Sequence, residues 1–242
     1  MAEPRFHTLP EGHRIAFRHA PGTGQTLVFL PGYMSDMSGG KASAVFDWAQ
    51  GAGRGCLLLD YSGCGLSDGE FADGTLTRWA NEAIALIEAM VDGPVTLIGS
   101  SMGGWLMLLV AEALGERVNG MVGIAAAPDF SAWGYDAAQK ARLAEGETVF
   151  EANPYGPDPT PTYAGFWSDA QNRLMLDRTI LIRCPVHLIH GQRDADVPWE
   201  TSLRLADALL SDQVQVTLVK DGDHRLSREQ DIALLLRVIE AL

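Results

Sequence analysis

The sequence predicts an α/β fold in which helices cover both faces of a mostly parallel sheet. Short apolar runs of strand length alternate with segments of helical pattern, and successive βαβ units produce this alternation. The apolar runs lie at residues 26–30, 56–59, 95–98, 121–125, 186–189 and 214–219. The helical patterns lie at residues 41–52, 75–91, 102–115, 199–210 and 228–241. A length of 242 residues and an apolar content of 47% fit one domain with a sizeable core.

Two short segments near the N-terminus predict an antiparallel hairpin at one edge of the sheet. They occupy residues 6–8 and 14–17, and Pro10, Glu11 and Gly12 between them supply the turn. Together with the six apolar runs, the hairpin predicts a mixed sheet of eight strands.

The interval 128–178 departs from the alternation. It is rich in prolines and aromatic residues, and a segment of this length inside a compact domain usually has a function. Because it lies between two predicted strands, we expect a lid above their carboxyl ends, over a core formed by residues 1–127 and 179–242. A helical addition on the side of the sheet stays an open alternative. The residues that suggest the lid are Pro154, Pro157, Pro159, Pro161, Trp133, Tyr135, Phe150, Tyr155, Tyr163, Phe166 and Trp167.

The composition disfavours several classes of function. A net charge of −13 and the lack of any lysine or arginine run argue against binding to nucleic acid or to an anionic membrane. The longest apolar run, 105–111, is too short to span a bilayer. Three cysteines without C-x-x-C spacing indicate neither a disulfide framework nor a zinc site. With no secretory signal or mitochondrial presequence in view, we expect a cytoplasmic protein.

The pentapeptide at residues 99–103 nominates Ser101 as a nucleophile. It reads G-x-S-x-G and lies between a predicted strand and a predicted helix. The serine takes a strained backbone conformation in such a turn, so the residues two before and two after it, Gly99 and Gly103, must lack bulk. Ser100 is a poorer candidate, because its own frame has Ile98 and Met102 where the glycines are needed.

A base and an acid for this serine follow two later strands. His224 comes directly after the run 214–219, and Asp194 comes after the run 186–189 in the pattern H-G-x-x-D. A serine hydroxyl needs a base, and the base needs a carboxylate to orient it. Asp196 and Asp129 are rival acids, of which Asp196 is expected to cap the turn before the next helix.

The other histidines of the chain are less suitable bases. His187 and His190 lie within or at the end of a strand and are interpreted as packing or loop-fixing residues. Cys64 lies in a glycine-rich loop that could approach the site.

The loop after the run 26–30 is expected to complete an oxyanion hole. It reads Pro31-Gly32-Tyr33, and the backbone amide of Tyr33 would pair with that of Met102 at the start of the helix after the serine. A plain turn is the alternative for this loop. The chemistry needs neither a metal nor an organic cofactor.

Together these motifs resemble the α/β-hydrolase superfamily over nearly the whole chain. The resemblance rests on residues 31–33, 60–67, 99–108, 190–199 and 223–225. Within the superfamily, the mitochondrial thioesterases that remove palmitoyl groups from protein cysteines, and that are also described as acyl-glucuronide esterases, look similar at residues 32–35, 60–63, 100–108 and 197–199. Bacterial relatives of these enzymes look similar too.

The resemblance implies an α/β-hydrolase fold with a triad of Ser101, Asp194 and His224. It also implies a small-molecule or acyl-protein ester or thioester as substrate. Hydrolysis of a carbon–carbon bond on the same triad, or ligand binding without turnover, are the alternative functions.

Overall fold

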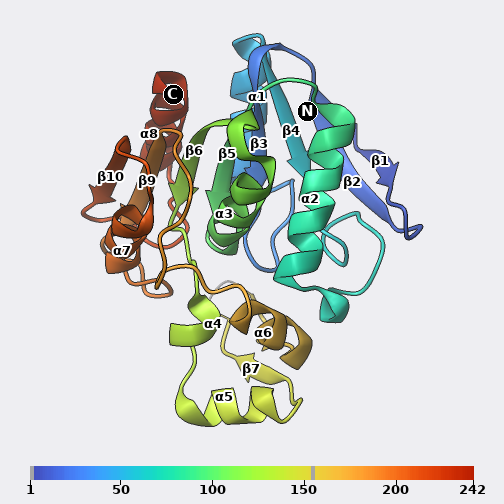
Figure 1. Cartoon of the computed structure of the whole chain (residues 1–242), viewed down its shortest axis with the longest axis vertical. Coiled ribbons are helices and arrows are strands. Elements are labelled where there is room, and N and C mark those ends of the chain that lie inside the picture. The colour runs from blue at the N-terminus through green and yellow to red at the C-terminus, as the bar shows by residue number, and fades with distance from the viewer. Residues whose placement is uncertain (1–2, 154–155) are drawn as a thin grey trace.

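A computed structural model describes residues 3–153 and 156–242, so Pro154 and Tyr155 of the predicted lid lie outside the described residues. Within those ranges the chain forms an eight-stranded sheet in the order β1-β2-β4-β3-β5-β6-β9-β10. The strands β1 and β2 form the expected antiparallel hairpin, β2 pairs antiparallel with β4, and the remaining neighbours are parallel. The predicted fold class is confirmed (Figure 1).

The strands of the sheet follow the predicted runs, with shifted ends. They are β1 (Arg5–Thr8), β2 (Arg14–Ala20), β3 (Thr23–Leu30), β4 (Arg54–Leu59), β5 (Val95–Ser100), β6 (Val118–Ile124), β9 (Val186–Gly191) and β10 (Val214–Val219). The expected strand 121–125 begins earlier and ends at Ile124, because Ala125 has a φ of 45° and leaves the extended conformation.

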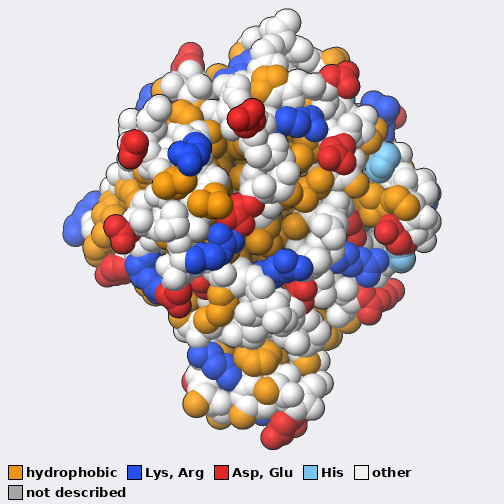
Figure 2. All heavy atoms as spheres, in the orientation of Figure 1, with side chains coloured by type: hydrophobic (Ala, Val, Ile, Leu, Met, Phe, Trp, Pro, Cys, Tyr) orange, Lys and Arg blue, Asp and Glu red, His pale blue; other side chains and the backbone are white. Residues whose placement is uncertain are grey.

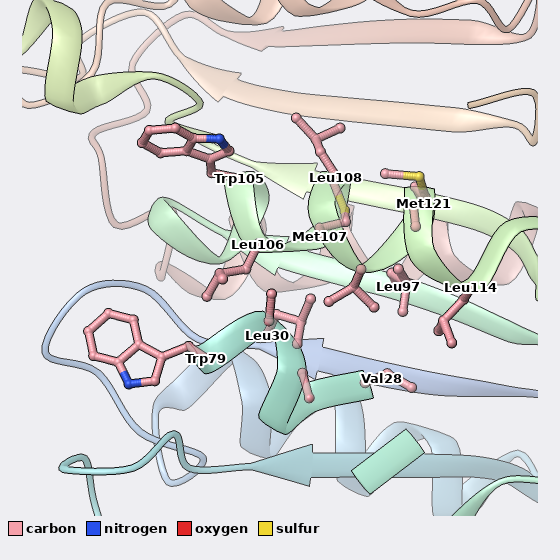
Figure 3. Close-up of a cluster of buried hydrophobic side chains, with 14 of the residues drawn as sticks. Val28, Leu30, Trp79, Leu97, Trp105, Leu106, Met107, Leu108, Leu114 and Met121 are labelled. Atoms are coloured by element: carbon pink, nitrogen blue, oxygen red, sulfur yellow. The ribbon is translucent and has the colours of Figure 1, made fainter. Parts of the chain in front are cut away.

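Helices cover both faces of the sheet because the strands are apolar on both sides. Val28 and Leu30 point into the same layer as α2 (Leu76–Met90), α3 (Met102–Leu114) and α7 (Glu200–Ala208). Figure 3 shows part of this layer, with strand and α3 side chains in one cluster. Leu27 and Phe29 point the other way, toward α1 (Gly40–Gly51) and α8 (Glu229–Ala241). This period of two is the pattern of a strand buried on both faces.

Residues 128–178, hereafter segment 128–178, form a group of short elements between β6 and β9. They are α4 (Phe130–Trp133), α5 (Ala137–Ala144), β7 (Val149–Glu151), β8 (Thr160–Thr162) and α6 (Ala164–Gln171). The strands β7 and β8 pair antiparallel as a separate small sheet. Figure 1 shows α4, α5, β7 and α6 together at one end of the molecule. Two short 3-10 turns, Phe71–Asp73 and Gly115–Arg117, complete the elements of the described chain.

The surface carries charged side chains of both signs. On the face drawn in Figure 2, basic and acidic groups are scattered among hydrophobic ones rather than gathered into one patch. In the described part of the chain, no helix is both long and apolar enough to cross a bilayer.

Candidate active site

Ser101 occupies a strained turn between β5 and α3. Its φ of 55° and ψ of −121° lie in a region that residues other than glycine rarely adopt. A Cβ on Gly99 would lie 2.3 Å from the Gly103 carbonyl oxygen, and one on Gly103 would lie 2.0 Å from the Leu30 carbonyl oxygen. The expectation that both glycines are needed for lack of space is therefore confirmed.

The structure brings the three predicted catalytic side chains into one chain of hydrogen bonds. The Nε2 atom of His224 lies 3.0 Å from the Oγ atom of Ser101. The Nδ1 atom of His224 lies 2.8 Å from Oδ2 of Asp194. These are the contacts required of a nucleophile, a base and the carboxylate that orients the base.

Close packing of two loops sets the distance between Asp194 and His224. A Cβ on Gly191 would lie 2.3 Å from the carbonyl oxygen of Gly222, so the loops after β9 and β10 are in backbone contact. The amide of Arg193 donates to that same carbonyl at 2.8 Å. The two loops therefore hold the carboxylate and the imidazole at a fixed separation.

Asp194 is ionised, and both of its carboxylate oxygens accept hydrogen bonds. Its side chain is 0% exposed. Burial favours the neutral acid, but hydrogen bonds from His190 and His224 outweigh it and hold the pKa of Asp194 below its ordinary range. Its Oδ1 atom accepts from the amides of Asp196 at 2.9 Å and Val197 at 2.8 Å.

Asp194 caps the turn before Val197, since its carboxylate accepts from the amides two and three residues after it. The capping role expected of Asp196 stays a prediction. The helix α7 begins after Trp199, which makes no side-chain cap bond.

Asp129, the second rival acid, is engaged elsewhere. Its buried carboxylate accepts from the amides of Met175 and Leu176, at 2.8 Å for the shortest bond to each. It thus ties the start of segment 128–178 to its end. The thiol of Cys64 is also buried, and desolvation with the nearby Asp60 and Glu82 raises its pKa to about 12.

The two backbone amides of the expected oxyanion hole belong to residues that line the same cavity as Ser101. Among the hydrogen bonds of the described residues, neither Tyr33 N–H nor Met102 N–H donates to a protein oxygen. Gly32 lies against the turn, since a Cβ there would be 3.3 Å from Cβ of Ser101. Two free donors beside a nucleophile can stabilise a developing oxyanion.

The side chain of Tyr33 joins this loop to segment 128–178. Its hydroxyl donates to the Pro161 carbonyl oxygen at 3.0 Å. Its ring lies with its centroid 5.0 Å from that of Phe166 and 4.9 Å from that of Phe71. Aromatic contacts of this kind stabilise the arrangement beyond simple burial.

A cavity of about 750 Å³ opens over the nucleophile. Ser101, Met102, Tyr33 and His224 line it together with residues of segment 128–178. That segment contributes three aromatic residues, Phe130, Trp133 and Tyr135, and also polar ones, among them Glu151, Thr160 and Thr162. Asp36, Lys41 and Arg225 line the cavity from the core. The volume suits a small-molecule ligand or a flexible acyl chain.

Sequence reasoning missed the contact between His190 and Asp194 and the presence of Lys41. His190 fixes its loop as expected, with Nε2 3.1 Å from the Val197 carbonyl oxygen. The same nitrogen also lies 3.1 Å from Oδ2 of Asp194, which was not expected. The four-residue spacing of the two in H-G-x-x-D was the available signal. Lys41 lines the cavity, donates to the Arg225 carbonyl oxygen, and has a pKa lowered to about 8, chiefly by burial; no motif pointed to it.

A group of potential metal ligands coincides with the site. Asp194, Asp196 and His224 each offer a ligand atom, and these atoms lie within 4.8 Å of one another. Both ring nitrogens of His224 and both carboxylate oxygens of Asp194 are already hydrogen-bonded. A metal ion at this place would have to replace some of these bonds.

Comparisons with known proteins identify the relatives of this chain. A family model described as "Alpha/beta hydrolase family" matches residues 27–237. The mouse protein "Palmitoyl-protein thioesterase ABHD10, mitochondrial" is 38% identical over 243 residues, covering 98% of this chain and 81% of that protein. The structure of a putative hydrolase from Agrobacterium vitis S4 has a TM-score of 0.92 at 36% identity, covering 99% of each chain. The structure of mouse alpha/beta hydrolase domain-containing protein 10 has a TM-score of 0.93 at 34% identity, covering 99% of this chain and 98% of that one.

Proposed function

This chain belongs to the alpha/beta hydrolase family and is a hydrolase, and we propose that it cleaves long-chain acyl thioesters, such as S-palmitoyl groups on protein cysteines, with Ser101 as the nucleophile. One observation carries the proposal: the hydrogen-bonded series Ser101, His224 and Asp194 opens into a cavity with an aromatic wall. The relatives named palmitoyl-protein thioesterases support the choice of thioester.

The first half of the reaction transfers the acyl group to Ser101. The Oγ atom attacks the carbonyl carbon while its proton moves to Nε2 of His224, and Asp194 stabilises the imidazolium that forms. The amides of Tyr33 and Met102 donate to the oxygen of the tetrahedral intermediate. Collapse of the intermediate breaks the carbon–sulfur bond, and His224 returns the proton to the departing thiolate.

The second half releases the acid. Water takes the place of the thiol, His224 removes a proton from it, and the resulting hydroxide attacks the acyl-enzyme carbonyl. The same two amides stabilise the second oxyanion, and Ser101 leaves with the proton held by His224. The enzyme returns to its initial state with a free carboxylic acid as product.

We propose that segment 128–178 is the lid that binds the acyl chain. Its aromatic side chains Phe130, Trp133 and Tyr135 line the cavity that also contains Ser101. An apolar wall lowers the free energy of a bound hydrocarbon chain roughly in proportion to the area removed from water. Preference among chain lengths therefore depends on this segment, whereas reactivity depends on the loops of the sheet.

Hydrolysis of matched acyl thioesters and oxygen esters, from acetyl to palmitoyl, tests the function. We expect kcat/KM to rise with chain length and to be higher for each thioester than for its ester. The Ser101→Ala variant should lose at least about four orders of magnitude in kcat, and Ser100→Ala, its matched control in the same turn, should keep most of the activity.

Each alternative result has a distinct meaning. Low and similar rates on all substrates, abolished by Ser101→Ala, would support the triad and reject the long-chain thioester. Activity that persists in Ser101→Ala would reject Ser101 as the nucleophile.

Location is a separate question from activity. The curated relatives are named as mitochondrial proteins, whereas a cytoplasmic location for this chain stays a prediction from its sequence. Fractionation of the cells that produce it, followed by immunoblotting, tests that prediction.

A further inference from the structure

His190 is a second histidine bound to the carboxylate of Asp194. It lies on β9, and its side chain is 0% exposed. The Nε2 atom lies 3.1 Å from Oδ2 of Asp194 and 3.1 Å from the carbonyl oxygen of Val197. The Nδ1 atom lies 2.7 Å from Oγ of Ser202 on α7. The mechanism described above uses neither His190 nor Ser202.

These contacts determine which ring nitrogen of His190 carries hydrogen. A carbonyl oxygen and an ionised carboxylate can only accept, so the Nε2 atom between Val197 and Asp194 must donate. In the neutral ring, Nδ1 then accepts the hydrogen of the Ser202 hydroxyl. Ser202 is 1% exposed, so water does not replace this bond.

The Oδ2 atom of Asp194 therefore accepts two imidazole N–H groups. One comes from Nδ1 of His224 at 2.8 Å and the other from Nε2 of His190 at 3.1 Å. Both draw on the charge of one oxygen in a buried site, where such bonds are strongly coupled. The bond to His190 makes Oδ2 a weaker acceptor for His224, and the imidazolium of His224 is stabilised less.

We propose that His190 is a positioning residue that limits the basicity of His224, because it donates a competing hydrogen bond to the same oxygen of Asp194. The inference rests on the proposed function, because it requires His224 to act as the base. His190 makes no contact with Ser101 and acts only through Asp194. With this bond in place, His224 stays unprotonated and able to accept the Ser101 proton at a lower pH than it would if Asp194 were bonded to His224 without His190.

Other charged groups share the environment of His224. Asp36, Lys41, Glu151, Asp196 and Arg225 line the same cavity, and Asp223 precedes His224 in the chain. A substitution at His190 leaves all of them in place. The difference between the pH profiles of a variant and the wild type therefore reports the contribution of His190.

The pH dependence of kcat/KM for wild type, His190→Leu and His190→Gln tests the proposal. Leucine has a similar size and no donor, whereas the glutamine amide can place an N–H near the position of Nε2. We expect the acid limb of His190→Leu to move to higher pH by about 0.5 to 1 unit, with little change in KM. His190→Gln should restore most of the wild-type profile.

A histidine on the same strand supplies the matched control. His187 is hydrogen-bonded to Thr217 at 2.8 Å and is not among the residues that line the cavity. His187→Gln should leave the acid limb where it is in the wild type. An equal shift in His187→Gln and His190→Leu would show a general structural effect and overturn the proposal.

A measurement on the unmodified protein keeps the proposal testable if His190→Leu does not fold. Imidazole nitrogen–proton correlation NMR of the wild type should assign hydrogen to Nε2 of His190 and to Nδ1 of His224. Hydrogen on Nδ1 alone of His190, or an acid limb of His190→Leu that coincides with the wild type, would contradict the proposal. Activity retained in Ser101→Ala would instead reject the proposed function, and the NMR result would still decide the tautomer.

Discussion

Two regions meet over Ser101, and they are held in different ways. The loops after β9 and β10 are joined by backbone hydrogen bonds, from Gln192 to Val219 and from Arg193 to Gly222, each 2.8 Å long. Segment 128–178 is attached to the core largely by side chains. Tyr33 donates to Pro161 at 3.0 Å, and Trp105 donates to the Arg173 carbonyl at 3.1 Å.

The difference separates reactivity from substrate choice. Backbone contacts at the end of a sheet leave little freedom, which suits groups that must stay within hydrogen-bond distance of one another. Contacts made by side chains can be exchanged while the sheet keeps its pairing. Substitutions in the two regions should therefore change different kinetic constants.

The largest effect is expected at the base. Removal of the imidazole in His224→Ala leaves the Ser101 hydroxyl without its proton acceptor, so kcat should fall by at least about four orders of magnitude. Binding of a long-chain substrate analogue should be retained, because the cavity wall is unchanged. A loss smaller than about tenfold in kcat, measured by single turnover, would remove His224 from the reaction.

Substitution of the carboxylate should change both stability and its dependence on pH. Since the folded-state pKa of Asp194 is lower than the ordinary value, its ionised form stabilises the fold above about pH 4, and this contribution is lost as pH falls through the lowered value. Asp194→Asn should reduce the free energy of unfolding by on the order of 1 to 3 kcal/mol at neutral pH. Urea titrations at several pH values should show the gap between variant and wild type narrowing in acid, and a gap independent of pH would contradict the account.

A smaller and more selective effect is expected in the aromatic wall. Trp133→Ala should lower kcat/KM for a palmitoyl thioester by about tenfold, since lost apolar contact of about 1.4 kcal/mol has that effect. The acetyl thioester should be hydrolysed as before. Trp133→Phe keeps an aromatic ring at this position and serves as the control. Equal losses of kcat/KM on both substrates would mean that Trp133 contributes to the reaction itself and not to binding of the acyl chain.

The smallest effect is expected where the two regions touch. Tyr33→Phe removes the hydroxyl bonded to Pro161 but keeps the ring and the backbone amide. The free energy of unfolding should fall by about 1 kcal/mol. Because burial, with Tyr135 and Tyr163 nearby, raises the pKa of Tyr33 well above its ordinary value, the effect should not vary between pH 6 and pH 9, roughly the range in which this phenol stays neutral. Thermal unfolding at both ends of that range checks the expectation.

The same contrast explains how much could be predicted from the sequence. The strands and the turn at Ser101 follow local patterns, namely alternation along a strand and glycines at fixed positions, so both were found. The strand β3 begins at Thr23 rather than at residue 26, because the Thr23 amide donates to the Gly53 carbonyl oxygen at 3.0 Å. A hydropathy pattern cannot predict a backbone hydrogen bond of this kind.

Segment 128–178 was harder to predict in detail. The strand β8 contains Pro161, which argues against a strand and is tolerated because β7 is its partner in a sheet of only two strands. The helix α5 did have a local signal, since Asp136 and Gln139 form a capping box at its start. The contact between His190 and Asp194 depends on the path of the turn between them, which is held by backbone hydrogen bonds from Gln192 and Arg193 to the loop after β10.

The most direct test of the account is to trap the acyl-enzyme. Wild-type protein mixed with excess palmitoyl thioester and quenched rapidly in acid should carry one palmitoyl group, which peptide mass spectrometry should locate on Ser101 and which Ser101→Ala should lack. Acylation of another residue, or rapid turnover with no acylated protein at any quench time and no burst of thiol release, would contradict the mechanism.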